Sequence, residues 1–228
     1  MRAYTDSVID FVVTGLSANS VPYLSGLDQQ RFLHAAVVEG RAPSTVMMLE
    51  HESVYTAGKR TQAHERPVDG TLVIDVDRGG KITWHGPGQL VGYPIMRLAD
   101  PVDVVRYVRC LENMLIAVLN DLGVVGASRV DGRSGVWMRG SDKIAAIGIR
   151  VAQGVTMHGF ALNCSNGFEA YRTIVACGLP DAGVTSVSYE LGHTVTPADV
   201  TPLIERHFGA HVHDIVGARA SMPEGVSA

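Results

Sequence analysis

The residues of this sequence best suited to chemistry are a polar, glycine-rich segment, a cysteine and a lysine, which lie far apart along the chain. Segment 78–89 holds four glycines and one proline among twelve residues, together with Arg78, Lys81, Thr83, His85 and Gln89. Glycine and proline break a helix and let backbone amides approach a ligand closely. Apolar runs at 71–77 and 90–95 flank the segment. The sequence therefore predicts a functional loop held between two strands, with a flexible surface hairpin as the alternative.

The cysteine is Cys177, which ends the apolar run 174–176 and is followed by Gly178. The glycine leaves room beside the sulfur for an acyl group and frees a backbone N–H to face it, as a nucleophile requires. The alternative is a buried structural cysteine, the commoner role of a free thiol. Cys110, inside a helical pattern, and Cys164, at a strand end, are predicted to be packing residues.

The lysine is Lys143, which opens an otherwise apolar strand. It is either a solvated turn residue or an amine that faces a pocket. If it lies close to Cys177, its ammonium group favours the thiolate, which is the reactive form of the side chain. The same amine could then carry a proton to or from the reacting groups.

The remaining titratable candidates lie at strand ends or edges. His85, next to Gly-Pro-Gly, is either a ligand-binding side chain and oxyanion donor or a residue that stabilises a turn. His51 and His158 are expected to be structural. Asp75 and Asp77 alternate with apolar residues, so we interpret them as strand-edge carboxylates and not as an acid–base pair.

The composition excludes several classes of protein. The 228 residues are 46% hydrophobic with a net charge of −4, which fits one globular domain and argues against bulk binding of nucleic acid. No apolar run is long enough to span a membrane, and the N-terminus does not have the pattern of a secretory signal. The three cysteines have no C-x-x-C spacing, so we expect no disulfide scaffold, no metal site and a cytoplasmic location. The sequence has no G-x-x-x-x-G-K-[ST], H-E-x-x-H or G-x-S-x-G motif.

The periodicity of apolar residues predicts an α/β domain that covers residues 1–228, with a frayed tail over 209–228. Its sheet is mixed and largely antiparallel, is flanked by helices and is not doubly wound. Asp28 and Asp103 are expected to cap helices that Gly40 and Gly123 end. The predicted helices span 27–39, 103–122 and 198–208, and the predicted strands span 44–51, 54–58, 71–77, 90–95, 134–138, 143–151 and 156–163.

Segment 78–90 resembles the signature of the lipoyl(octanoyl) transferases, the octanoyl-[acyl-carrier-protein]:protein N-octanoyltransferases of lipoate biosynthesis. Further stretches agree with this family in order and spacing, so that the resemblance covers roughly residues 25–195. They are 49–51 with 54–58, 142–148, 158–163, 177–178 and 184–187.

The resemblance implies the fold of biotin and lipoate protein ligases and an acyl-thioester intermediate on Cys177. Lys143 would lower the pKa of that thiol or act as acid and base. The acyl chain and its carbonyl would be held by three segments. These are Arg78, Gly79, Gly80, Lys81, Ile82, Thr83, Trp84 and His85, then Ala146, Ile147 and Gly148, and then Gly159, Phe160 and Ala161.

The resemblance also implies the reaction and its partners. The donor would be octanoyl-acyl carrier protein, which brings its own phosphopantetheine. The acceptors would be lysines of apo lipoyl domains in 2-oxoacid dehydrogenase E2 subunits and in the glycine cleavage H protein. Transfer from thioester to amide runs downhill, so we expect no requirement for ATP, and we expect no cofactor. We also expect the protein to be a monomer. An acidic donor protein predicts a basic rim, with Lys59, Arg60, Arg129, Arg133, Arg139 and Arg150 as candidates.

Two alternatives remain open. A lipoate or biotin protein ligase of the same fold would activate a free acid with ATP, and a requirement for ATP would identify it. A non-catalytic acyl-binding module would bind the chain without turnover, and Cys177→Ala would leave its binding unchanged.

Overall fold

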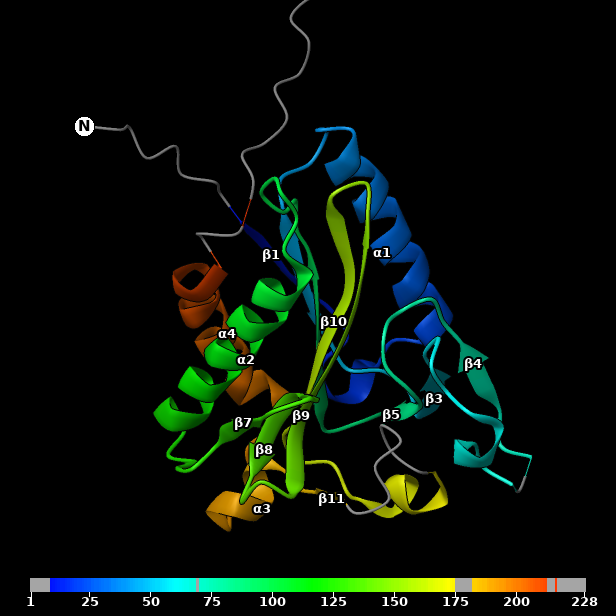
Figure 1. Cartoon of the computed structure of the whole chain (residues 1–228). Coiled ribbons are helices and arrows are strands. Elements are labelled where there is room, and N and C mark those ends of the chain that lie inside the picture. The colour runs from blue at the N-terminus through cyan, green and yellow to red at the C-terminus, as the bar shows by residue number, and fades with distance from the viewer. Residues whose placement is uncertain (1–8, 69, 175–181, 213–215, 217–228) are drawn as a thin grey trace, which may run out of the picture.

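A computed structural model describes residues 9–68, 70–174, 182–212 and 216 of the chain. It has three layers: a pair of helices, a large sheet, and a further layer made of a helix and a small sheet (Figure 1). Among the described residues, no helix combines the length and the apolar character needed to cross a membrane.

The large sheet is mixed and mostly antiparallel, as predicted. Its two parallel contacts are made by the edge strand β1 with β2 and by the short β11 with β9. The strand order is β1 (Asp10–Val13), β2 (Thr45–Leu49), β6 (Gln89–Ile95), β10 (Val155–Asn163), β9 (Asp142–Ala152), β8 (Arg133–Met138) and β7 (Ser128–Val130), with β11 (Gly183–Val184) beside β9.

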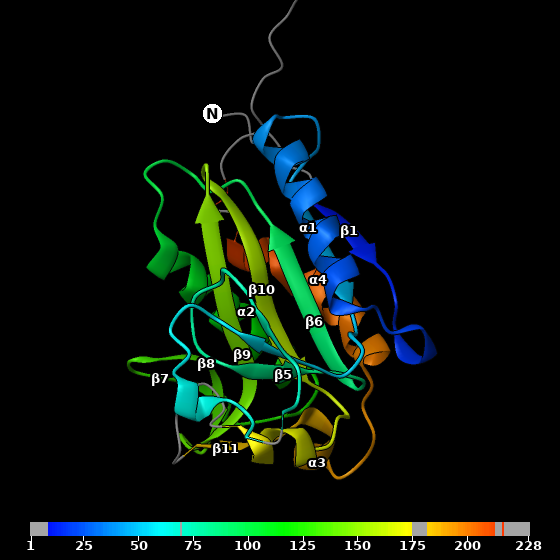
Figure 2. The same ribbon diagram turned by 90° about the vertical axis from the view of Figure 1, so that its right-hand side faces the viewer.

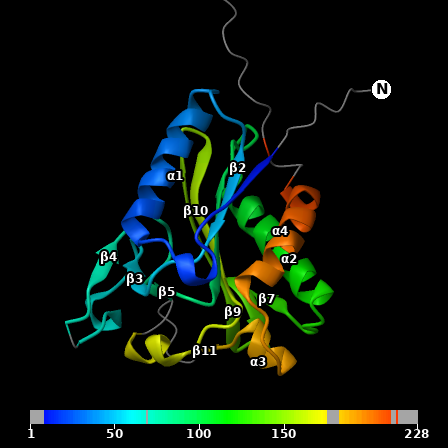
Figure 3. The ribbon, with the colours of Figure 1, turned by 180° about the vertical axis from the view of Figure 1, so that it is seen from behind.

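Different elements cover the two faces of this sheet (Figures 2 and 3). Helices α2 (Val104–Asp121) and α4 (Pro197–Val212) bury the main apolar core against one face. Helix α1 (Tyr23–Val38) packs on the other face, beside a three-stranded sheet of β4 (Val73–Asp75), β3 (Val54–Ala57) and β5 (Thr83–His85). The short helix α3 (Val187–Leu191) lies at one end of the sheet.

The long central helix and the antiparallel meander are confirmed. Asp103 caps α2 by accepting a hydrogen bond from the Arg106 N–H at 2.9 Å, and Gly123 follows the helix with a φ of 89°. The predicted strands at 134–138, 143–151 and 156–163 are the observed β8, β9 and β10. These elements were predicted correctly because their sequences combine capping residues with a clear periodicity of apolar residues.

Two helix boundaries and the prediction of one uninterrupted loop were wrong. Helix α1 begins at Tyr23 and not at residue 27, so Asp28 lies inside it, where it forms an ion pair with Arg31 at 3.1 Å. Helix α4 continues to Val212, so residues 209–212 are helical and not a frayed tail. In both cases, burial of apolar side chains outside the predicted bounds, such as Tyr23 and Val212, extends the helix. The segment predicted as one loop also contains strand β5.

Small residues allow the central strands to pack closely. A Cβ atom added to Gly159 on β10 would lie 2.1 Å from the carbonyl oxygen of Gly92 on the neighbouring strand β6. Because that oxygen belongs to the backbone of a central strand, a side-chain rotation cannot relieve the clash. Gly209, on the surface-facing side of α4, has no atom within 4 Å of such a Cβ.

We therefore expect Gly159→Ala to lower the free energy of unfolding by about 2–3 kcal/mol, because the backbones of β6 and β10 would have to separate. The melting temperature should fall by roughly 5–10 °C in thermal unfolding followed by circular dichroism. The matched control, Gly209→Ala, should gain about 0.5–1 kcal/mol, because alanine favours a helix over glycine. Equal stability of the two variants would contradict this account of the central strands.

Candidate active site

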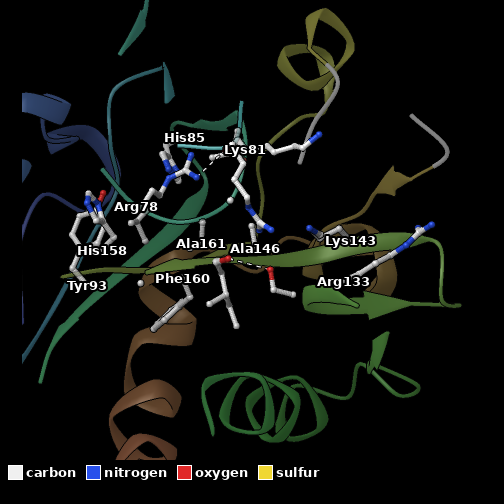
Figure 4. Close-up of a pocket in the computed structure, with 18 of the residues that line it drawn as sticks. Arg78, Lys81, His85, Tyr93, Arg133, Lys143, Ala146, His158, Phe160 and Ala161 are labelled. Atoms are coloured by element: carbon white, nitrogen blue, oxygen red, sulfur yellow. Dashed lines mark hydrogen bonds between the residues drawn. The ribbon is translucent and has the colours of Figure 1, made fainter. Parts of the chain in front are cut away.

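A pocket of about 320 Å³ lies between the large sheet and the loop that joins β4 to β5 (Figure 4). Its floor consists of small residues on β9 and β10. Ala146 pairs with Ala161 across the two strands, and Gly148 pairs with Gly159. Because successive residues of a strand point to opposite faces, these four positions share one face, and their small size leaves room above it.

Arg78 holds the roof of the pocket. Its side chain is buried, and its Nη2 donates to the carbonyl and hydroxyl oxygens of Thr56, both at 2.9 Å. Its Nη1 donates to the carbonyls of Gly79 and Lys81 at 3.1 and 2.8 Å. A buried guanidinium requires such hydrogen bonds, and these ones fix the loop to strand β3.

Glycines let this roof approach the sheet. The Gly79 N–H donates to the carbonyl of Ile149 on β9 at 2.9 Å. A Cβ atom at Gly148 would lie 3.1 Å from both the Arg78 side chain and the Gly79 carbonyl, which is tighter than ordinary contact. The absence of a side chain at Gly148 therefore allows the loop to pack directly on β9.

His85 is neutral and carries its proton on Nδ1. Burial, with a smaller contribution from the nearby His51, lowers its pKa to about 3. The Gln89 side chain donates from its amide nitrogen to Asn163 and Tyr171, so its Oε1 accepts from His85 Nδ1 at 2.8 Å. Nε2 of His85 is then a hydrogen-bond acceptor. A neutral His85 in this tautomer has no proton on Nε2 to donate to an oxyanion.

His51 and His158, which we expected to be structural, are buried near His85. His51 donates from Nδ1 to the carbonyl of Val21 at 2.8 Å and accepts from the Tyr93 hydroxyl at 2.7 Å. Burial lowers its pKa to about 4, so it is also neutral at pH 7. His158 donates to Asp77 at 2.9 Å and lines the pocket, together with Tyr93, at the end away from Lys143 (Figure 4).

Lys143 faces the pocket because of a β-bulge. Val136 pairs with Ala145 and Trp137 with Lys143, so one step along β8 matches two steps along β9. The additional residue, Ile144, reverses the alternation of side chains. Lys143 thereby lines the same pocket as Ala146, and its Nζ lies 4.5 Å from the centroid of the Trp137 ring.

Cys177 lies outside the described residues, which end at 174 and resume at 182 on either side of it. Residues 182–184, where the described chain begins again, line a smaller pocket together with Lys143 and Trp137. Val184 pairs with Lys143 in the sheet. The other two cysteines behave as packing residues. Cys164 is fully buried, which raises its pKa to about 12, and Cys110 is half-buried on α2.

Most of the predicted binding residues line the pocket, but three do not. Ile82 and Trp84 point to the opposite side of β5 and pack with Tyr55 in a separate apolar cluster, and Gly79 contacts β9. Those that do line it are Arg78, Gly80, Lys81, Thr83, His85, Ala146, Ile147, Gly148, Gly159, Phe160 and Ala161. Lining residues that the sequence did not reveal include Tyr23, Val91, Tyr93, Ser134 and His158, because strand register and helix packing bring them here.

The candidates for the basic rim differ in their contacts. Arg139 forms ion pairs with Glu190 and Asp142, and Arg150 forms one with Asp77. Arg60 and Arg133 line the pocket. Among residues 9–68, 70–174, 182–212 and 216, no three His, Cys, Asp or Glu side chains are grouped to hold a metal ion.

Comparisons with known proteins match most of the chain. An octanoyltransferase of Clavibacter michiganensis subsp. michiganensis is 66% identical over 208 residues, which cover 88% of this chain and 89% of the relative. An octanoyltransferase of Leifsonia xyli subsp. xyli is 56% identical over 222 residues, covering 95% and 99% of the two chains. The relatives named octanoyltransferase are thus matched over nearly their whole length.

Solved structures share the fold at low sequence identity. A lipoate protein ligase described as putative, from Thermoplasma acidophilum, superposes with a TM-score of 0.68 at 17% identity, covering 90% of this chain and 85% of that one. Biotin protein ligase from Aquifex aeolicus gives 0.52 at 10% identity, covering 90% and 69%. The predicted fold class is therefore confirmed. Residues 22–209 match the lipoyl protein ligase A/B catalytic domain, and the chain belongs to that family.

Proposed function

We propose that this protein is an octanoyltransferase, which moves an octanoyl group from octanoyl-acyl carrier protein to a lysine of an apo lipoyl domain. The observation that supports this most strongly is the pocket with a floor of alanine and glycine and with Lys143 at one end, in a chain 66% identical to an octanoyltransferase. The acceptors we propose are the lipoyl domains of 2-oxoacid dehydrogenases and the glycine cleavage H protein, in the cytoplasm.

The pocket suits a medium-length acyl chain. Its 320 Å³ lies near the lower end of the range of about 300–1,000 Å³ typical of small-molecule sites. Val91 and the Ala146–Ala161 pair provide apolar surface along it, whereas the ring of Phe160 packs in the main core on the other face of the sheet. Burial of each methylene contributes about 0.8 kcal/mol, so the length of the buried acyl chain strongly affects the binding free energy.

The first step is acyl transfer to the protein. The Cys177 thiolate attacks the thioester carbonyl of the donor, and backbone amides stabilise the oxyanion. The bond between the carbonyl carbon and the pantetheine sulfur then breaks, and the departing thiolate takes a proton from Lys143. The chain stays in the pocket as a thioester of Cys177.

The second step transfers the chain to the acceptor. The lysine of the lipoyl domain attacks the Cys177 thioester, loses a proton to Lys143 and becomes an amide, while Cys177 leaves as a thiolate. The energy of the thioester drives both steps, so ATP has no role. The position of Lys143 over Trp137, beside residues 182–184, supports the proposed pairing with Cys177.

A transfer assay tests this function against the ligase alternative. Purified protein, octanoyl-acyl carrier protein and an apo lipoyl domain should give an octanoylated domain without ATP, measured by intact-protein mass spectrometry. Free octanoate with ATP and Mg²⁺ should give none. Modification of the domain only in the second mixture would identify a ligase instead.

Narrowing the floor of the pocket should change the preferred chain length. Ala146→Val adds two methyl groups to the middle of the floor, so the KM for an octanoyl donor should rise about tenfold while a butyryl donor is used as before. Ala152→Val, on the same strand but not among the residues that line the pocket, is the matched control and should behave as the wild type. The same preference in Ala146→Val as in the wild type would show that the chain does not lie on Ala146.

A further inference from the structure

We propose that Glu112, a carboxylate on the face of the sheet opposite the pocket, is a positioning residue for Lys143 and acts through the β8–β9 bulge. This inference rests on the proposed function of Lys143. Glu112 is not among the residues that line the pocket, so its effect must pass through the strands between them.

Glu112 lies on α2 with no exposed surface. Its Oε1 accepts a hydrogen bond from the Gly135 N–H on β8 at 3.0 Å. Its Oε2 accepts from Arg109 Nη1, one helical turn earlier, at 2.8 Å. A carboxylate in an apolar core is costly, and an apolar residue of similar size would serve packing better. We infer that the carboxylate is present because its hydrogen bond holds the backbone of Gly135.

Gly135 is the residue next to the bulge. Its φ is 110°, which favours glycine, and a Cβ atom there would lie 2.4 Å from the carbonyl oxygen of Ala145. The same Cβ would lie 3.5 Å from Cε of Lys143, so the stem of the lysine crosses β8 at this glycine. Glu112 therefore holds the backbone of Gly135 from one face of the sheet. The side chain of Lys143 lies against the same residue on the other face.

The bulge decides which way Lys143 points. The step from Val136 to Trp137 on β8 spans Ala145 to Lys143 on β9, with Ile144 in excess. Without that excess residue, Lys143 would share a face with Ala145, which lies in the core beneath α2 and α4. By fixing Gly135 to α2, Glu112 favours the bulged register and keeps Nζ of Lys143 over the Trp137 ring.

A first test is structural and does not depend on catalysis. In a crystal structure of Glu112→Leu, which has no acceptor for the Gly135 N–H, we expect Lys143 Nζ to leave the Trp137 ring and the register at Ile144 to change. In Glu112→Gln, whose side-chain oxygen can still accept that bond, both features should persist. Arg109→Gln removes the ion pair but leaves the bond to Gly135, and should match the wild type. An undisturbed Lys143 in Glu112→Leu would overturn the proposal.

A second test measures the reactivity of Cys177. The rate of its alkylation by iodoacetamide at pH 7, followed by peptide mass spectrometry, reports the thiolate that Lys143 stabilises. We expect a roughly tenfold slower rate in Glu112→Leu and a rate near that of the wild type in Glu112→Gln. In a Lys143→Ala background, Glu112→Leu should cause no further loss, because both changes remove the same effect.

The outcomes separate this inference from the proposed function. Equal losses from Glu112→Leu with and without Lys143, or equal losses in the leucine and glutamine variants, would show that Glu112 does not act through Lys143 and the Gly135 bond. If Lys143→Ala alone does not slow alkylation, the proposed Cys177–Lys143 pair fails, while the crystal structures still decide whether Glu112 positions the lysine. If Glu112→Leu does not fold, the glutamine variant and the Arg109→Gln control carry the comparison, and a displaced Lys143 in Glu112→Gln would contradict the proposal.

Discussion

The pocket depends first on one buried guanidinium. Arg78 donates to four oxygens of Thr56, Gly79 and Lys81, and so turns the carbonyls of a glycine-rich loop toward a single cation. Such a loop has no apolar core of its own and would otherwise be held mainly by its flanking strands. With Arg78 in place the loop rests on β9, where Gly148 and Gly79 allow the backbones to meet. The roof is therefore rigid without filling the space beneath it.

The large sheet serves stability on one face and binding on the other. The face toward α2 and α4 carries the larger apolar residues of the main core, which contribute most of the hydrophobic stabilisation. The face toward the loop carries Ala146, Gly148, Gly159 and Ala161, whose small side chains leave a cavity. Strand β9 contributes side chains to both faces. Its bulge places Lys143 on the face of the pocket and not on the face of the core.

The sequence predicted the elements with strong periodicity and clear caps, such as α2 with Asp103 and the meander of β8, β9 and β10. It also located most of the pocket, because glycine-rich and small residues mark close backbone approach. It could not reveal the reversal at Ile144, since a bulge is defined by how two strands pair, here β9 with β8. Nor could it place Tyr23 or His158 beside the loop, because those contacts depend on helix packing and strand register.

The central claim is that the octanoyl chain passes through a thioester on Cys177. Intact-mass spectrometry of the protein mixed with octanoyl-acyl carrier protein, without ATP or acceptor, tests it most directly. The account predicts a gain of about 126 Da, the mass of one octanoyl group replacing a thiol hydrogen. Hydroxylamine should remove this adduct, Cys177→Ala should lack it, and Cys110→Ala should keep it. No adduct on the wild-type protein, with acceptor modified all the same, would contradict a covalent intermediate.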